Sequence, residues 1–333
     1  MGKILIFGAT GLVGAYTILD LKDRGYDVIA VGRRKSDNGF FGSYSIPYYS
    51  VDITCSSGFT DLPRDEIDTI IHLAGAMPAS MSGYNPHLYI HSVLEGTLNV
   101  LEYAVVVSAK RIVFAQSRAD SNYLMGKTPI PSDIVKKFPL TGDHSVYSIC
   151  KNASVDLIEH FYHQYGIKRF VLRFPTIYGY HPNPYFYVNG VKKMMSYRLI
   201  MEKAIKGESV EIWGDPRRGK EIVYVKDAVQ IIGHCIDSEL DGGVYNVGRG
   251  VPVTLDEQIN GIVSVFSNPN APSQIIYRPD MPDAREYVND ISKTQKELGY
   301  IPEYDYYKLL VDFKKYMMDE PMKQLWGTRA DYE

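Results

Sequence analysis

The sequence predicts an α/β protein built on a doubly wound parallel sheet, with a smaller C-terminal α/β domain. Three observations lead to this fold class. Short apolar runs alternate with helical patterns in the first half of the chain, a glycine-rich turn follows the first run, and the elements become shorter after Phe174. Apolar runs separated by helices are typical of buried parallel strands. The 333 residues, 45% hydrophobic and 23% charged, suit one large or two modest globular domains.

The first apolar run is followed by three evenly spaced glycines. Residues 4–7 are apolar, Gly8, Gly11 and Gly14 come next, and a helical pattern then begins. Such a turn presents backbone N–H groups and the positive end of a helix dipole to a phosphate. We expect Gly8 to permit the turn, Gly11 to admit a pyrophosphate and Gly14 to let helix and strand pack closely. The sequence therefore predicts a dinucleotide site, although the spacing is GxxGxxG rather than GxGxxG.

The remaining elements follow from hydrophobic periodicity and from the positions of glycine and proline. Strands are expected at 27–31, 69–73, 111–115, 169–173, 210–213 and 244–247. Helices are expected at 88–107, 146–165, 191–206, 224–236, 254–266, 291–298 and 306–317. Residues 115–142 and 178–189 are predicted to be loops, and the polar segment 319–333 is predicted to be partly disordered.

These elements predict two domains, between which the chain crosses more than once. Residues 1–174 are expected to form the dinucleotide-binding domain, completed by about 220–248. Residues 175–219 and 249–330 are expected to form the substrate-binding domain.

The end of the second strand bears on the choice of cofactor. A carboxylate there binds the ribose 2′-OH of NAD, whereas an arginine accommodates the 2′-phosphate of NADP. Arg33 lies 19 positions after Gly14 and is followed by Arg34, with no acid at that point. A solvated basic turn is the alternative interpretation. The pattern favours NADP(H), with NAD(H) as the second choice.

Three polar residues are arranged as a carbonyl-reducing site requires. Tyr147 and Lys151 lie at i and i+4 and so share one helix face. A lysine ammonium beside a phenol favours the phenolate, which makes the tyrosine a usable acid or base. Ser117 follows an apolar strand, at the edge where parallel sheets bind ligands, and its hydroxyl can donate to a carbonyl or alkoxide oxygen. A chance surface pair is the alternative for Tyr147 and Lys151 alone.

With these motifs together, the chain resembles the extended short-chain dehydrogenase/reductase family, in its nucleotide-sugar epimerase and reductase branch. The resemblance spans nearly the whole chain. It rests on GATGLVG at 8–14, VDI at 51–53, HLAGA at 72–76, GTLNVL at 96–101, VFAQS at 113–117, Tyr147 with Lys151, LRFPTIYG at 172–179, EIVYVKD at 221–227, YNVG at 245–248 and DISK at 290–293.

The resemblance implies a Rossmann-type cofactor domain and assigns roles to residues. Ser117, Tyr147 and Lys151 would be catalytic. The cofactor would contact Gly8, Thr10, Gly11, Leu12, Val13, Gly14, Arg33, Arg34, Asp52, Ile53, Leu73, Ala74, Gly75, Tyr147, Lys151, Phe174, Pro175 and Ile177. The substrate would contact Ser117, Tyr178, Lys220 and Arg278, although Tyr178 could equally belong to the core. The resemblance also implies a homodimer formed through the helices at 88–107 and 146–165.

Several positions depart from the family pattern. Ser92 stands where the family usually has an asparagine. Ser117-Arg118-Ala119 replaces the Thr-Asp-Glu of sugar-nucleotide dehydratases and lacks their acid and base, so a 4,6-dehydratase is disfavoured. Lys220-Glu221 replaces an Arg-Asp pair, and Arg278 lies where the family often holds the substrate diphosphate.

These features predict an NAD(P)-dependent enzyme that epimerises, reduces or oxidises a nucleotide-activated hexose. A reductase of a non-nucleotide carbonyl compound and a catalytically silent NADP(H)-binding scaffold are the alternatives. The net charge of −3 and the lack of a long basic run argue against nucleic-acid binding. No apolar stretch approaches the length of a membrane span. Three scattered cysteines favour the reducing cytoplasm and show no metal-ligand spacing, so no metal is expected.

Overall fold

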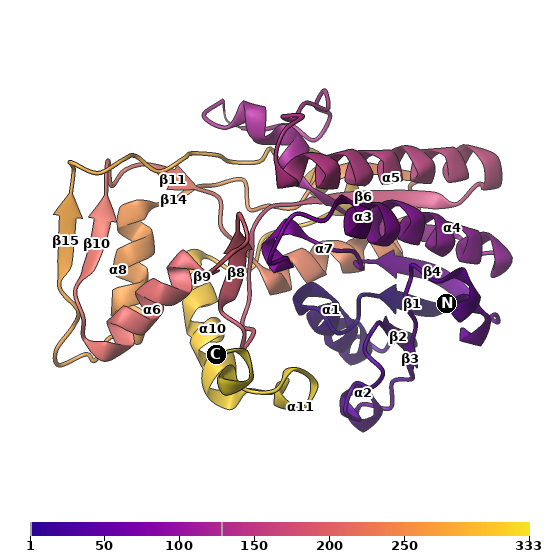
Figure 1. Ribbon diagram of the computed structural model, residues 1–333, viewed down its shortest axis with the longest axis horizontal. Coiled ribbons are helices and arrows are strands. Elements are labelled where there is room, and N and C mark those ends of the chain that lie inside the picture. Colours follow the sequence, from indigo (N-terminus) through magenta and orange to yellow (C-terminus); the bar gives the residue numbers. More distant parts are fainter. Residues whose placement is uncertain (1, 128) are drawn as a thin grey trace.

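The computed structural model describes residues 2–127 and 129–333 and is built around a seven-stranded sheet. Every neighbouring pair of strands in this sheet is parallel (Figure 1). The order is β13 (Gly242–Asn246), β6 (Lys168–Phe174), β5 (Arg111–Ser117), β4 (Ile67–His72), β1 (Lys3–Phe7), β2 (Val28–Gly32) and β3 (Tyr48–Ser50). The chain order reverses between β1 and β4, and such switch points bind ligands at the carboxyl ends of the strands. The predicted fold class is confirmed.

Alternate residues of β1 show why helices cover both faces of the sheet. Ile4 and Ile6 point into one apolar cluster, whereas Leu5 and Phe7 point into another. Helices α1 (Leu12–Asp23) and α7 (Val225–Asp237) pack against each other on the first face. Helices α4 (Gly96–Val106) and α5 (Asp143–Tyr165) pack on the second.

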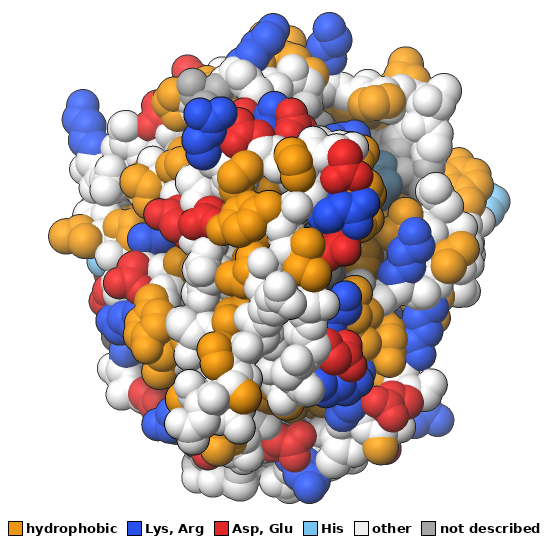
Figure 2. Space-filling model, turned by 90° about the vertical axis from the view of Figure 1, so that its left-hand side faces the viewer, with side chains coloured by type: hydrophobic (Ala, Val, Ile, Leu, Met, Phe, Trp, Pro, Cys, Tyr) orange, Lys and Arg blue, Asp and Glu red, His pale blue; other side chains and the backbone are white. Residues whose placement is uncertain are grey.

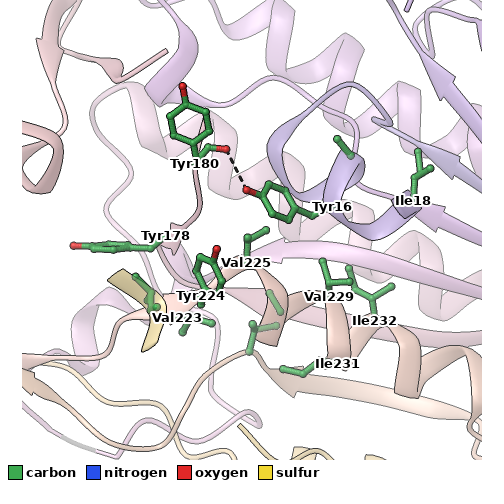
Figure 3. Close-up of a cluster of buried hydrophobic side chains, with 14 of the residues drawn as sticks. Tyr16, Ile18, Tyr178, Tyr180, Val223, Tyr224, Val225, Val229, Ile231 and Ile232 are labelled. Carbon is green, nitrogen blue, oxygen red and sulfur yellow. Dashed lines mark hydrogen bonds between the residues drawn. The ribbon is translucent and has the colours of Figure 1, made fainter. Parts of the chain in front are cut away.

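The first apolar cluster extends beyond the sheet into the C-terminal part of the chain. Tyr16 of α1, Tyr178, Tyr180 and Tyr224 gather in it, as Figure 3 shows. The hydroxyl of Tyr16 donates to the carbonyl oxygen of Tyr180 at 3.5 Å. This shared core fixes the position of the C-terminal elements relative to the sheet.

The C-terminal part is a set of helices with short strand pairs. The helices are α6 (Ser196–Lys206), α8 (Leu255–Phe266), α9 (Ser292–Leu298) and α10 (Tyr306–Asp319). The strand pairs are β10 (Val210–Trp213) with β15 (Ile275–Arg278), β11 (Gly219–Lys220) with β14 (Val253–Thr254), and β12 (Val223–Tyr224) with β7 (Ile177–Tyr178). Figure 2 views the end of the molecule at which β10 and β15 lie, where hydrophobic side chains are interspersed with charges of both signs.

Several segments differ from the predicted elements. A hairpin of β8 (Tyr185–Val188) and β9 (Val191–Met194) replaces the predicted loop and the start of the predicted helix at 191. Its turn is Asn189-Gly190, and both residues have positive φ, which is the usual signature of a tight hairpin turn. Residues 118–124, predicted to be loop, form a 3₁₀ helix, and β3 was not predicted.

The prediction of partial disorder for 319–333 is wrong. Helix α11 (Lys323–Trp326) follows α10, and a 3₁₀ turn over Arg329–Tyr332 ends the chain. Met322, Leu325 and Trp326 are buried, because their spacing places all three side chains on the face that meets the core. The short helices α2 (Phe40–Ser43) and α3 (Pro86–Tyr89) and the 3₁₀ helices over Ser56–Asp61 and Pro78–Ser80 complete the regular elements outside the candidate site. Among these residues, no helix combines the length and the apolar character needed to cross a bilayer.

Candidate active site

The glycine turn between β1 and α1 has the geometry of a phosphate cradle. Gly8 has a φ of +89°, and the N–H of Gly11 donates to the Gly8 carbonyl at 3.0 Å. A Cβ on Gly14 would lie 2.2 Å from the Gly8 oxygen, so this position requires glycine. No side chain caps α1, which leaves the first-turn N–H groups of Leu12 and Val13 available to an anion. These features fit a dinucleotide pyrophosphate.

The segment after β4 lies against this turn. The N–H of Leu73 donates to Phe7 O at 3.0 Å, and a Cβ on Gly8 would lie 2.8 Å from the nitrogen of Ala74. Gly75 follows with a φ of +141°. The hydroxyl of Ser92 accepts from the N–H of Ala76 at 3.1 Å, so serine maintains a polar link where the family usually has asparagine. Ser92 lies in a π-helical stretch over Ile90–Glu95, a local structure that periodicity did not predict.

The residues expected around the adenosine are also at the carboxyl edge of the sheet. Arg33 is exposed after β2, whereas the Nη1 of Arg34 donates to the carbonyl oxygen of Leu325 at 2.7 Å. Asp52 accepts from the N–H of Thr54 at 3.0 Å, and Ile53 O accepts from the Asn99 amide at 2.7 Å. One of the two arginines predicted to bind a phosphate is therefore hydrogen-bonded to the C-terminal segment of the chain.

Ser117, Tyr147 and Lys151 are brought together where β5 ends beside α5. The hydroxyl of Tyr147 lies close enough to that of Ser117 for Ser117 to act on its pKa. The Nζ of Lys151 donates to Ala115 O at 2.6 Å, two residues before Ser117. Tyr147 and Lys151 are both buried, with 7% and 6% of their surfaces exposed. The structure thus places a phenol, a hydroxyl and an amine at one point of the sheet edge.

Burial controls the protonation of this group. It raises the pKa of Tyr147 to about 12, and the hydroxyl of Ser117 opposes that rise. Burial also lowers the pKa of Lys151 to about 7. The expected lowering of the Tyr147 pKa by Lys151 is not found, because desolvation is the largest effect and the lysine donates to a backbone carbonyl.

The segment after β6 is held beside the same cluster by a buried ion pair. Arg173 contacts Asp120, Nε to Oδ1 at 3.2 Å and Nη2 to Oδ2 at 3.3 Å, and its Nη1 donates to Ser132 O at 2.7 Å. This pair anchors the 3₁₀ helix that follows Ser117. Phe174 ends β6 and is followed by Pro175, while Ile177 pairs with Val223 in the β7–β12 ladder.

Two predicted substrate contacts, Tyr178 and Arg278, have partners within the protein. Tyr178 is 4% exposed and belongs to the buried cluster drawn in Figure 3. Its ring stacks on that of Tyr197 with a centroid distance of 4.1 Å, so the core alternative holds for this ring. Burial holds the pKa of its phenol well above the usual value. Arg278 ends β15 and contacts Glu211 at 3.3 Å and Asp280 at 2.9 Å. In this structure its charge is already neutralised by two acids, which argues against a diphosphate contact.

The third predicted substrate residue, Lys220, lies near a cation that the sequence analysis did not assign. The guanidinium carbon of Arg118 is 3.8 Å from the centre of the Tyr287 ring, and the backbone of Tyr287 is bridged to that of Lys220. Arg118 is the residue directly after Ser117. The sequence did show that Arg118 stands where sugar-nucleotide dehydratases have an acid. That observation was used only to disfavour dehydration, and no binding role was assigned to Arg118.

Known proteins share this fold, or are similar to the chain in sequence. A dTDP-glucose 4,6-dehydratase of Xanthomonas campestris is 24% identical over 92% of this chain and 90% of its own length. The structure of a UDP-glucose 4-epimerase from Thermotoga maritima with UDP-glucose matches with a TM-score of 0.76 at 23% identity, covering 96% of this chain and 99% of that one. A UDP-glucuronic acid 4-epimerase from Bacillus cereus in complex with NAD matches with a TM-score of 0.70 at 19% identity, covering 97% and 99%.

The model of one protein family matches most of the chain. The match runs over residues 4–248, from β1 through the segment that follows β13, and so includes the glycine turn, Ser117, Tyr147 and Lys151. We conclude that the chain belongs to the NAD dependent epimerase/dehydratase family.

Proposed function

We propose that this nucleotide-sugar enzyme is an epimerase, which oxidises a ring hydroxyl of a nucleotide-activated hexose and reduces the resulting ketone from the other face. The observation that carries the proposal is the cluster of Ser117, Tyr147 and Lys151 at the carboxyl edge of the sheet. Dehydration is disfavoured because Arg118 and Ala119 follow Ser117, and neither side chain can serve as the acid or base that eliminates water.

The proposed roles follow from the contacts of each residue. Tyr147 removes the proton of the sugar hydroxyl and later returns it, while Ser117 donates to the same oxygen and orients it. Lys151, whose Nζ donates to Ala115 O, lies one helical turn after Tyr147 and can contact the cofactor ribose. When bound, the nicotinamide supplies a hydride acceptor and donor, and the protein supplies position and proton transfer.

We propose NAD(H) as the resident cofactor. The family description and the engagement of Arg34 by Leu325 O support this choice. The preference for NADP(H), which Arg33 and Arg34 predict, would require Arg34 to leave that carbonyl, or Arg33 to bind the phosphate alone. Mass spectrometry of the purified protein distinguishes the two dinucleotides.

The predicted domain division assigns the two ligands. Residues 1–174 and 220–248 would hold the cofactor, and residues 175–219 and 249–330 the sugar nucleotide. A homodimer through α4 and α5 is proposed as well, since Val106 and Ile149 on these helices are 59% and 45% exposed. Three free thiols, those of Cys55, Cys150 and Cys235, support the cytoplasm as the location.

Turnover of a sugar nucleotide by Tyr147→Phe tests the proposal. Wild-type protein is incubated with UDP-glucose, UDP-glucuronic acid or dTDP-glucose, and the sugar product is identified by NMR. We expect epimerisation, with kcat reduced about 100- to 10,000-fold in Tyr147→Phe because the proton carrier is lost. Tyr165→Phe is the control, since Tyr165 lies on the same helix and is 52% exposed. Undiminished turnover in Tyr147→Phe would refute the mechanism, and a dehydrated product would refute epimerisation.

A further inference from the structure

The surroundings of Ser117 contain two cations that lack an acidic partner. Arg118 stacks on Tyr287, and its Nη1 is buried without a hydrogen-bond partner in the part of the chain that the structure describes. Lys220 is half-buried and forms no ion pair with any described residue. Burial, and then the charge of Arg118, lowers the pKa of Lys220, so the two cations are close enough to repel each other.

Neighbouring cations of the same segment are paired. Arg217 contacts Asp215 at 2.9 Å, and Arg218 contacts Asp283 at 3.4 Å and Glu286 at 3.0 Å. Within residues 217–220, Lys220 is therefore the cation without an acidic partner among the described residues. Placing like charges together in a partly desolvated position is unfavourable unless an anion joins them.

The acids nearest to this pair are already used. Glu221 follows Lys220, but its carboxylate accepts N–H groups from Arg249 at 2.6 Å, Gly250 at 2.7 Å and Asn289 at 3.1 Å. Asp120 is bound by the buried side chain of Arg173. Glu221 therefore acts on Arg118 only through its charge, and no described carboxylate forms an ion pair with Arg118, which leaves this place open to an anionic group of a ligand.

The position of Arg118 indicates which part of a ligand this is. Arg118 directly follows Ser117, so the Cα atoms of the two residues are about 3.8 Å apart. The Arg118 guanidinium lies over the ring of Tyr287, whose backbone is bridged to that of Lys220, so an anion bound there would belong to the same ligand that meets Ser117. A guanidinium binds a carboxylate or a phosphate with two parallel hydrogen bonds, while an ammonium adds a point charge.

We infer that Arg118 and Lys220 form an oxyanion subsite beside Ser117, which binds an anionic group carried by the sugar nucleotide. The inference rests on the proposed function and adds to it a specificity-determining residue, Arg118. The shared chemistry is an oxyanion next to the reacting sugar. Its source is either a carboxylate on the sugar itself or the phosphate attached to the sugar.

Substrate kinetics of Arg118→Gln separate these two sources. KM and kcat are measured for UDP-glucuronic acid and UDP-glucose, and the dissociation constant of UDP is measured by calorimetry. Arg118→Lys retains the charge without the planar fork, and Arg217→Gln removes an arginine that is 87% exposed and already paired. Melting temperature and NAD binding show that each variant is folded.

A sugar carboxylate in the subsite predicts that Arg118→Gln raises KM for UDP-glucuronic acid about 10- to 100-fold, with little change for UDP-glucose or UDP. A phosphate in the subsite predicts a rise of that size for all three ligands. In either case Arg118→Lys should recover part of the loss. The inference is overturned if Arg118→Gln and Arg217→Gln behave alike. The proposed function fails separately, if the wild-type protein turns over no sugar nucleotide.

Discussion

The ionisable side chains of the site are governed by burial more than by their neighbours. The pKa of Tyr147 is raised and that of Lys151 is lowered, because desolvation disfavours both the phenolate and the ammonium. Their neutral forms are therefore favoured together. A neutral phenol cannot take up a proton, so the proposed role of Tyr147 requires it to lose its own proton first, and the neutral amine of Lys151, on the same helix face, is the base that can accept it.

Burial also governs the pKa of His72 at the end of β4, and this predicts that the folded protein loses stability in acid. Its side chain is fully buried, its Nε2 lies 3.1 Å from the hydroxyl of Thr97, and burial together with the charge of Lys151 lowers its pKa to about 3. The unfolded chain binds a proton at His72 below about pH 6.5, whereas the folded chain does not until about pH 3. The stability that His72 contributes is therefore present above pH 6.5 and is lost as the pH falls towards 3.

Denaturant titrations between pH 4 and pH 7 measure this loss. The free energy of unfolding should depend on pH by up to about 1.4 kcal/mol per unit from this residue alone. In His72→Gln the slope should be smaller by that amount, since glutamine does not titrate but can still bond Thr97. Equal slopes for the two proteins would contradict the assignment.

Alanine substitutions at Gly11 and Gly14 of the first turn should distinguish an effect on cofactor binding from an effect on folding. A Cβ on Gly14 would lie 2.2 Å from Gly8 O, so Gly14→Ala must displace the β1–α1 junction, at a cost of about 1 to 3 kcal/mol in the free energy of unfolding. A Cβ on Gly11 would lie 3.4 Å from the same oxygen, an ordinary contact, but it would project where the pyrophosphate approaches.

We therefore expect Gly11→Ala to keep its melting temperature within a few degrees of the wild type while NAD binding weakens, measured by calorimetry. Gly14→Ala should lose both stability and NAD affinity. Gly42→Ala is a control, because a Cβ there has no atom within 4 Å and the backbone is not in the left-handed region. A Gly11→Ala variant that binds NAD normally would show that the dinucleotide does not use this turn.

Most elements with strong local signals were predicted, although the β8–β9 hairpin with its Asn189-Gly190 turn was not, and elements that depend on distant contacts were missed. The apolar runs of β1, β4, β5 and β6 and the i, i+4 pair of Tyr147 and Lys151 are local patterns. By contrast, β3 is three residues long and is defined by its pairing with β2. The buried pair of Asp120 and Arg173 joins residues 53 positions apart, so no periodicity could indicate it.

Two site assignments show the same limit. Tyr178 and Arg278 occupy family motif positions, but their environments are set by Tyr197, Glu211 and Asp280. Arg118 was visible as an unusual residue after Ser117. Its lack of an acidic partner could be recognised only after Glu221 and Asp120 were found to be engaged by other residues.

At the scale of the whole molecule, the C-terminal segment 320–333 connects the sheet to the C-terminal helices. On one side the indole N–H of Trp326 donates to Thr10 O at 2.9 Å in the glycine turn, and Gln324 and Asn38 exchange hydrogen bonds at 2.6 and 3.0 Å. On the other side Arg329 contacts Glu202 of α6 at 2.6 Å, and the Lys192 ammonium donates to Tyr332 O at 2.6 Å. Figure 1 shows α11 lying between α10 and the α1–α2 side of the molecule.

Trp326 is the residue on which this connection should depend most. It is 4% exposed, packs against His181 with a centroid distance of 4.5 Å, and approaches Tyr16 of α1 at 6.4 Å. Trp326→Ala should lower the free energy of unfolding by about 3 to 5 kcal/mol, because it leaves a cavity and an unpaired Thr10 carbonyl. The other tryptophan, Trp213, is 49% exposed on β10, so Trp213→Ala should cost less than about 1 kcal/mol.

Urea denaturation followed by circular dichroism measures both variants without relying on the fluorescence of the residue removed. Equal costs would show that the C-terminal segment does not stabilise the junction. A large cost confined to Trp326→Ala, accompanied by weaker NAD binding, would show that the segment also supports the glycine turn through Thr10.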